Sequence, residues 1–172
     1  MFAKMYGMET IGLRYFNVFG QRHSPQSEYA AIIPKLVMQL MRHESPALNG
    51  DGEYSHDFNF IGNVVQANLL AVLTADAKAI NQVYNITFEE RTSLYQLAIC
   101  LKEMLSAFDE SIAGVNIMHE PVPVNTEDDV AITQKARELL GYQPHYSLRH
   151  GLLQSASWYW TYLPQLKLEI RN

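Results

Sequence analysis

The sequence predicts one α/β domain. Its 172 residues are 48% hydrophobic and 18% charged, which is enough apolar material for a single core. The short apolar run Ile11-Gly12-Leu13 is typical of a buried strand. By contrast, Ala30–Met41, Gly62–Thr74 and Leu94–Phe108 carry apolar residues at helical spacing. Short strands mixed with amphipathic helices indicate the α/β class.

Composition and charge exclude several kinds of protein. The net charge of −5 and the pI of about 5.6 argue against a nucleic-acid surface and against an anionic membrane partner. The single cysteine, Cys100, excludes an internal disulfide and fits a reducing compartment. No apolar run approaches membrane-spanning length, and the first four residues are not a signal peptide. We expect a cytoplasmic protein that contacts neither nucleic acid nor membrane.

The elements are predicted in order from spacing, caps and breakers. Residues 1–6 form a helical turn that Gly7 ends, and Thr10–Asn17 is a strand. The helix Gly62–Thr74 is expected to face the core with Val64, Val65, Leu69, Leu70 and Leu73. Loops are predicted at Gln21–Tyr29 and, with acidic residues, at Glu120–Asp129, and a tight turn of the kind that joins paired strands at Asn49–Gly52. An extended piece is predicted at Ser45–Leu48 and strands at Glu53–Phe60, Val83–Ile86 and Val115–Met118. Helices are predicted after Thr92 or Ser93, at Ile132–Leu140, and at Leu148–Leu163, which Ser147 caps.

The end of the first strand is the first candidate for a site. The chain turns polar and aromatic from Arg14 to Asn17 before Gly20. Ligands of open α/β sheets bind at the carboxyl ends of strands, and an asparagine there can donate and accept hydrogen bonds to a ligand. The alternative is a simple turn in which Asn17 bonds its own backbone.

Several short sequence motifs resemble those of one family in their order and spacing. They are LRYFNVFG (13–20), YAAIIPK (29–35), LNGDGEYSHDF (48–58), NVVQANLL (63–70), the pair Tyr84–Ile86 with Glu90–Ser93, and KARELLGY (135–142). Together they resemble the NAD-dependent epimerase/dehydratase family of extended short-chain dehydrogenases. The likeness is strongest to bacterial UDP-N-acetylglucosamine 4-epimerases, which supply surface polysaccharide.

The family's two best-known motifs do not occur in these 172 residues. There is no G-x-G-x-x-G, and no tyrosine has a lysine four positions later. The resemblance therefore implies the C-terminal part of a doubly wound Rossmann-type fold plus a small α/β substrate-binding domain. Residues of about 30–60, 84–92 and 110–172 would form the substrate-binding part, and the remainder would end the dinucleotide-binding fold.

The resemblance also implies site residues. Tyr15 and Phe16 match positions beside the nicotinamide end of NAD, and Asn17 matches an asparagine that contacts the diphosphate. The remaining substrate-binding positions lie along the chain at Ala31, Ile32, Leu36, Asn49 and His56. Of these, Leu36 stands where relatives place an aromatic over the nucleotide. No catalytic residue is expected in this chain, and the spacing of its histidines predicts no metal site.

Two departures from the family pattern are expected to weaken binding of a diphosphate. The family's S-R-D-F reads Ser55-His56-Asp57-Phe58 here, and histidine lacks the bidentate fork of arginine. A second family arginine falls near residues 121–123, where none stands. A charge-assisted hydrogen bond contributes roughly 1.5–3 kcal/mol, so two losses would weaken binding by ~10²–10⁴-fold.

These features together predict a function with open alternatives. The parent activity would be NAD-dependent 4-epimerisation of UDP-N-acetylglucosamine or UDP-glucose, with the chain inactive and without NAD when alone. A dehydratase or decarboxylase of the same superfamily is one alternative. Another is a non-catalytic remnant that binds nothing or associates with a full-length relative, and that self-associates because a truncated fold exposes apolar surface. A third is that a missing N-terminal half supplies the cofactor part.

Overall fold

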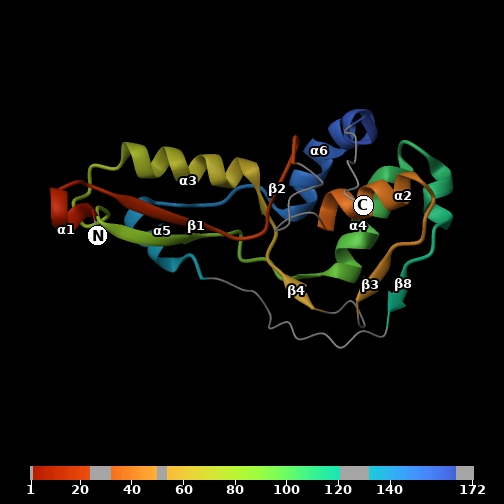
Figure 1. The fold of residues 1–172 in the computed structure, drawn as a ribbon, viewed down its shortest axis with the longest axis horizontal. Helices are drawn as coiled ribbons and strands as arrows, with labels where there is room; N and C mark the ends of the chain where they lie inside the picture. Colours follow the sequence, from red (N-terminus) through yellow and green to blue (C-terminus); the bar gives the residue numbers. More distant parts are fainter. Residues whose placement is uncertain (1, 24–31, 50–53, 121–131, 166–172) are drawn as a thin grey trace.

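The computed structural model describes residues 2–23, 32–49, 54–120 and 132–165. The α/β class is confirmed, since helices and short strands alternate along the chain. The elements form two lobes joined end to end (Figure 1). Each lobe has its own cluster of buried residues. We call them the strand lobe and the helical lobe.

The strand lobe is built on two parallel strands. β1 (Ile11–Tyr15) pairs with β6 (Gln82–Ile86) in parallel from Ile11↔Gln82 to Tyr15↔Ile86. α3 (Ile61–Leu73) packs beside β1, and α5 (Gln134–Leu140) packs on β6 (Figure 1). α1 (Phe2–Tyr6) precedes β1, and Gly7 ends it at φ 65° with its N–H donating to Ala3 O at 3.1 Å.

The helical lobe packs three helices around the larger core. They are α2 (Ile32–Met41), α4 (Leu94–Ser106) and α6 (Leu148–Tyr162), with the short helices η1 (Glu110–Gly114) and η2 (Leu163–Gln165). The predicted caps are confirmed: Ser93 and Gln96 form a capping box on α4, and Ser147 accepts from the His150 N–H on α6. β3 (Ala47–Asn49) pairs in parallel with β8 (Met118–Glu120) at the rim.

Short strands and buried asparagines join the two lobes. β2 (Val18–Phe19) pairs in parallel with β5 (Asn59–Phe60), and β4 (Ser55–His56) pairs with β7 (Thr92–Ser93) in antiparallel fashion. The Asn63 amide donates to Asn59 Oδ1 and to the Tyr146 carbonyl, and its oxygen accepts the N–H groups of residues 145 and 146. These bonds fix the chain entering α6 against the start of α3.

Three predictions about strands and the turn between them are wrong. The predicted strand Glu53–Phe60 is broken within its described part, because Asp57 turns inward between β4 and β5 to accept backbone N–H groups from residues 88 and 89. The turn predicted at Asn49–Gly52, of which 50–52 lie outside the described residues, does not join paired strands. β3 and β4 pair instead with β8 and β7. The predicted strand at Val115–Met118 lies later, at Met118–Glu120.

The predicted core face of α3 is also wrong in part. Val64 is buried and Leu70 is packed against the small core, as expected. Val65, Leu69 and Leu73, however, are 51%, 57% and 76% exposed. The inner face of the helix is formed instead by smaller residues, Asn63 and Ala67, which are buried. Apolar periodicity could not separate the two faces because both are apolar.

The lobes divide the chain differently from the predicted ligand-binding ranges. α4 (94–106), assigned to the dinucleotide part, packs in the helical lobe, while Ala136, Leu140 and Tyr142, assigned to the substrate part, pack in the strand lobe. The assignment of each range to a ligand stays a prediction.

Candidate functional site

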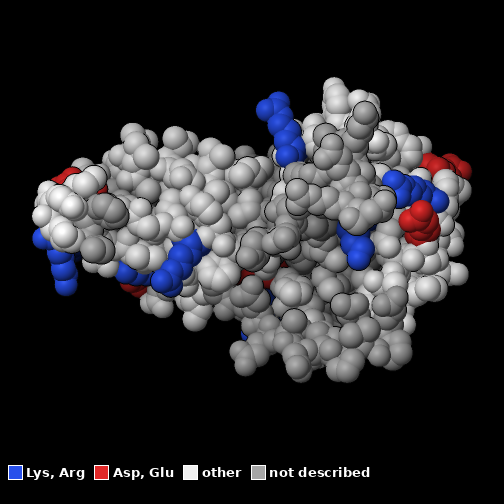
Figure 2. All heavy atoms as spheres, viewed as in Figure 1, with Lys and Arg blue, Asp and Glu red and all other residues white. Residues whose placement is uncertain are grey.

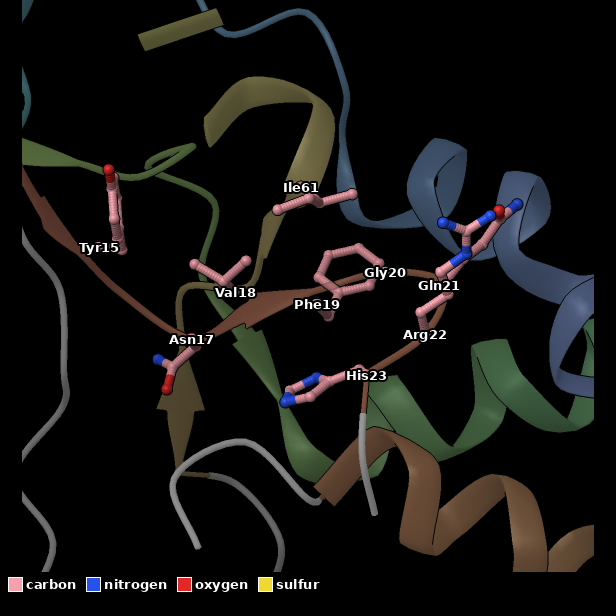
Figure 3. A pocket seen from close by; sticks show the side chains of 9 residues that line it. All are labelled: Tyr15, Asn17, Val18, Phe19, Gly20, Gln21, Arg22, His23 and Ile61. Atoms are coloured by element: carbon pink, nitrogen blue, oxygen red, sulfur yellow. The ribbon is translucent and has the colours of Figure 1, made fainter. Parts of the chain in front are cut away.

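A cavity of about 380 Å³ lies where β1 ends and the chain turns into β2 (Figure 3). It is lined by residues from the turn, from β2, from the segment after it and from the start of α3: Tyr15, Asn17, Val18, Phe19, Gly20, Gln21, Arg22, His23 and Ile61. The volume suits a single ring or sugar unit, because binding pockets begin at about 300 Å³. The cavity thus lies at the carboxyl end of the parallel strand β1, which is the position of the ligand site predicted from the sequence.

Asn17 holds the turn at the mouth of this cavity. Its φ of 35° is left-handed, a conformation that asparagine tolerates better than most residues. Its carbonyl accepts the Asn59 N–H at 3.1 Å, which ties the turn to β5. Its side-chain Nδ2 is buried without a hydrogen-bond acceptor among the described residues. A buried donor left unpaired costs free energy that a bound acceptor would recover.

Tyr15 lies on the other side of β2 from Asn17, together with Val18 and Ile61 (Figure 3). Its hydroxyl donates to Asn68 Oδ1 on α3 at 3.1 Å, and Asn68 Nδ2 donates to Val64 O at 2.8 Å. The ring is 45% exposed and held in place by this bond. It offers a fixed aromatic surface to a ligand.

The backbone after β2 is shaped by close contacts. Gly20 has φ 157°, and a Cβ there would lie 2.6 Å from the Ile61 Cγ2 atom, so only glycine fits. The Gly20 carbonyl accepts the Tyr159 hydroxyl at 3.2 Å, which anchors the segment to α6. Beyond it, Arg22 is left-handed at φ 64°, and burial lowers the pKa of His23 below its ordinary value. His23 therefore presents a neutral imidazole to the cavity at pH 7.

The structure brings together only two of the residues predicted to bind ligands. Tyr15 and Asn17 line the cavity, whereas Phe16, half-buried between them in sequence, does not. Ile32 and Leu36 lie on α2 in the helical lobe, where Leu36 is 1% exposed within the core. Asn49 ends β3, and Ala31 lies outside the described residues. Their proposed roles stay predictions.

His56 also lies away from the cavity. It is half-buried on β4, with its ring tilted against Phe58 at 5.9 Å between centroids. The neighbouring Asp57 is fully buried and accepts the Glu89 N–H at 2.7 Å and the Phe88 N–H at 3.3 Å. Burial raises the pKa of Asp57, and these bonds oppose the rise. The second half of the Ser-His-Asp-Phe word is therefore structural.

Glu89 extends this network to α5. Its carboxylate accepts the Thr133 N–H at 2.6 Å, the Thr133 hydroxyl at 2.7 Å and the Arg137 guanidinium at 2.6 Å. Burial raises the pKa of Glu89, but these bonds outweigh it and hold the pKa below its ordinary value. Glu89 itself is left-handed at φ 67°. The network fastens α5 to the loop after β6.

One cluster outside the cavity has the residue types of a hydrolytic triad. Ser111 Oγ lies 2.8 Å and Asp109 Oδ2 3.0 Å from His43 Nε2. Both contact the same ring nitrogen, and the serine hydroxyl donates to Asp109 Oδ1 at 2.6 Å. A triad needs serine and aspartate on opposite nitrogens. The cluster instead caps η1 and ties it to the end of α2.

Sequence reasoning missed most of the cavity lining. The left-handed Arg22 and the approach of Ile61 to Gly20 come from backbone geometry that local sequence does not encode. The glycine in LRYFNVFG was the one available signal. Within the described ranges, no three His, Cys, Asp or Glu side chains are placed to hold a metal ion. In the same ranges, no helix has the length and apolarity needed to cross a membrane.

Comparison with known proteins identifies relatives in one enzyme family. The profile of the NAD dependent epimerase/dehydratase family matches residues 1–87. The structure of a UDP-glucose 4-epimerase from Thermotoga maritima with UDP-glucose is 32% identical, with a TM-score of 0.76, and the match covers 92% of this chain and 48% of that one. A UDP-N-acetylglucosamine 4-epimerase from Methanobrevibacter ruminantium M1, in complex with UDP-N-acetylmuramic acid, is 28% identical with a TM-score of 0.75 and the same coverage of both chains.

A relative with a different activity is also similar. A UDP-N-acetyl-alpha-D-glucosaminuronate decarboxylase of Bacillus cytotoxicus is 24% identical over 166 residues, covering 90% of this chain and 47% of that protein. The chain spans about half the length of the curated relatives it matches.

Proposed function

The chain belongs to the NAD dependent epimerase/dehydratase family, and from that membership we propose that it supplies the nucleotide-sugar-binding part of a UDP-sugar 4-epimerase. The proposed substrate is UDP-N-acetylglucosamine or UDP-glucose, and the proposed setting is the cytoplasm, in the synthesis of surface polysaccharide precursors. The support is that both solved relatives described above are 4-epimerases with UDP-sugar ligands.

The observation that carries this proposal is the unpaired Asn17 amide beside a cavity of about 380 Å³. A diphosphate is rich in acceptor oxygens, and a hydrogen bond to a charged acceptor is stronger than one to a neutral acceptor. Asn17 would donate its Nδ2–H to such an oxygen. Tyr15, held by Asn68, would contact a ring beside it.

The cavity fits only part of an NAD molecule. Its volume suits one ring, and Tyr15, Val18 and Ile61 offer this ring an aromatic and apolar surface. When bound, NAD supplies the oxidation at sugar C4 and the return of the hydride. Tyr15 would orient the ring and exclude water from one of its faces. We do not expect these 172 residues by themselves to retain the cofactor, because no G-x-G-x-x-G turn is present to hold its pyrophosphate.

We propose further that the chain alone does not catalyse the epimerisation of a nucleotide sugar. Proton transfer at the sugar hydroxyl needs a positioned base, and no Tyr-x-x-x-Lys pair occurs in the sequence. Tyr15, the tyrosine that lines the cavity, donates its hydroxyl to Asn68 rather than to a lysine. Binding without turnover is therefore the expected behaviour.

Calorimetric titration of the chain with UDP-N-acetylglucosamine, UDP-glucose and UDP tests the proposal. We expect weak binding that Asn17→Ala reduces by about tenfold or more, because the substitution removes a hydrogen bond to a charged group. Asn116→Ala is the matched control, since Asn116 is exposed and lies between η1 and β8, away from the cavity. Equal affinities for Asn17→Ala and the unaltered chain, or no binding by the latter, would contradict the proposal.

The decarboxylase relative supports a second candidate within the superfamily. Its substrate name indicates a sugar with a carboxylate, and dehydratases also share the family name. A clear preference for a UDP-hexuronate over UDP-N-acetylglucosamine in the same titration would favour decarboxylation. If the chain binds no nucleotide sugar, this result would instead support the hypothesis that it is a non-catalytic remnant. Formation of the C4 epimer by the purified chain would show the predicted inactivity to be wrong.

A further inference from the structure

Asn59 is a buried polar residue in the short strand β5. Its side chain is fully buried, although asparagine is mostly found at protein surfaces. Both ends of its amide are hydrogen-bonded: Nδ2 donates to the Ile86 carbonyl at 3.0 Å, and Oδ1 accepts from Asn63 Nδ2 at 3.1 Å. The amide is therefore held in one orientation, because a flipped amide would place its oxygen against the Ile86 carbonyl oxygen.

The backbone of Asn59 holds the turn that carries Asn17. The Asn59 N–H donates to the Asn17 carbonyl at 3.1 Å, and the β2–β5 pairing begins at Val18↔Asn59. On the other side of the turn, Tyr15 pairs with Ile86 where β1 and β6 end. Ile86 is thus linked to the turn twice, once through the end of β1 and once through the side chain of Asn59.

This double link fixes the left-handed conformation of Asn17. Residues other than glycine seldom adopt a positive φ, and Asn17 has φ 35°. Such a conformation persists where the surrounding contacts over-determine it. The backbone conformation of Asn17 decides where its side chain points, and it places Nδ2 at the cavity without an acceptor among the described residues. The bonds of Asn59 therefore contribute to the direction of the Asn17 amide.

No charge from α3 contributes to this network. α3 begins two residues after Asn59 and contains no charged residue, and Figure 2 shows no blue or red spheres where α3 runs in Figure 1. The helix therefore supplies neither an ion pair to the network nor a cation to an anionic ligand. The orientation of the Asn17 amide depends instead on hydrogen bonds between neutral groups, which require short distances and fixed angles.

We propose that Asn59 is a positioning residue for nucleotide-sugar binding, which acts by holding the Asn17 amide toward the cavity. The role rests on the proposed function, in which Asn17 donates to a diphosphate oxygen. Asn59 does not line the cavity, so it acts through Asn17. A donor that is already oriented loses little conformational freedom on binding, and its hydrogen bond then contributes more to affinity. Without the Asn59 side chain, the amide would point at the cavity for only part of the time.

Calorimetric titration with UDP and UDP-N-acetylglucosamine tests the proposal, at a temperature where circular dichroism shows each variant to be folded. Asn59→Ala removes both bonds of the amide. Asn59→Leu removes the same bonds but keeps most of the side-chain volume, so it tests the proposal without a cavity. Each should weaken binding by about tenfold, as expected for Asn17→Ala, because each removes the benefit of the oriented donor.

The double variant separates positioning from a general loss of stability. When Asn17→Ala is already present, Asn59→Ala should weaken binding by less than about twofold, because the donor that it positions is absent. Ile112→Ala is the matched control, since Ile112 is fully buried in η1, which packs on α4. It should lower stability and leave the affinity within about twofold of the unaltered chain. Equal losses from Asn59→Ala with and without Asn17, or no loss at all, would overturn the proposal.

Hydrogen exchange in the unaltered chain gives a test that needs no variant. The Asn59 backbone amide donates to the Asn17 carbonyl, so a ligand that holds Asn17 in its oriented state also protects this amide. Saturating UDP should therefore slow its exchange. An unchanged exchange rate in a chain that binds UDP would count against the role of Asn59.

The side-chain amide resonances of Asn17 distinguish a failure of this proposal from a failure of the proposed function. In the ligand-free chain, Asn59→Ala and Asn59→Leu should shift these resonances, whereas Ile112→Ala should leave them in place. If the unaltered chain binds no nucleotide, the proposed function fails and this measurement alone decides the role of Asn59. Asn17 resonances that stay in place in both Asn59 variants would overturn the proposal whether or not a nucleotide binds.

Discussion

The helical lobe covers its apolar surface, whereas the strand lobe leaves much of its own exposed. The larger core joins α2, α4 and α6 around fully buried side chains such as Leu97, Leu101 and Leu105. Within the described part of the chain, the smaller core has seven buried residues beneath α3 and α5. Ten of the sixteen large apolar side chains that are exposed among the described residues lie on α1, β1, α3, β6 or next to them.

The difference follows from how each lobe is built. Three helices can bury one another with short connections. A parallel sheet needs cover on both faces and more than two strands to be stable by itself. Among the described residues the strand lobe has two paired strands, so it depends on its contacts with the helical lobe. The candidate site follows this division, because the cavity lies where the end of β1 leads into β2 at the junction of the lobes.

The largest expected effect compares the two cores directly. Leu101→Ala should destabilise the protein by about 3–5 kcal/mol and Leu140→Ala by about 2–3 kcal/mol, because the cost of a cavity grows with how completely the site is packed. Leu101 is 0% exposed in the larger core, and Leu140 is 6% exposed in the smaller one. Urea unfolding measures both, with Leu153→Ala as the exposed control. Equal losses would mean that the lobes are packed equally well.

A smaller effect is expected where α6 meets the β2–β5 junction. A Cβ on Gly151 would lie 2.6 Å from the Phe60 ring and 2.7 Å from the Phe19 ring. Gly151→Ala should therefore cost about 1–3 kcal/mol despite the better helix propensity of alanine. Gly114→Ala is the control, because nothing lies within 4 Å of its added Cβ. If both variants unfold at the same urea concentration, the junction is looser than the contacts indicate.

The smallest effect concerns the bonds that hold α5 in the strand lobe. Because the pKa of Glu89 is lowered in the folded state, its contribution is present above its ordinary pKa of 4.5 and is lost as pH falls through the folded pKa. Glu89→Gln should cost roughly 1–2 kcal/mol at pH 7, and this difference should vanish in acid.

Unfolding free energies from pH 3 to pH 7 measure that difference. Asp57 is unchanged in the variant, so its own raised pKa cancels from the comparison. Glu138→Gln is the control, since Glu138 is exposed on α5 and accepts one bond from the Gln134 side chain. A difference between Glu89→Gln and the unaltered chain that stays constant with pH would show that Glu89 acts by packing alone.

Local patterns predicted the helices and their ends well. Ser93 and Ser147 cap α4 and α6 as expected, and Gly141 ends α5 in the left-handed conformation. These features depend on neighbouring residues along the chain, so they can be predicted from the local sequence. The strands were harder to predict, because β2, β4, β5 and β7 are two residues each and exist through partners far away in sequence.

The candidate site divides in the same way. Asn17 and Tyr15 were identified from the LRYFNVFG motif at the end of the first strand, and both line the cavity. Ile61 and His23 were not identified, because they reach the cavity through the turn at Gly20 and the close approach of α3. Leu36 was expected over a nucleotide, and its 1% exposure comes from packing within α2, α4 and α6.

The sequence by itself determined the α/β class, the helices with their caps, the family words and the absence of charge on α3. All of these depend on residue type and on short-range spacing. The tertiary structure decided which apolar face of α3 is buried, which strands pair, and that Asp57 and Glu89 serve as acceptors for distant backbone groups. Pairing and burial are set by contacts between segments far apart in the chain, so no local pattern could specify them.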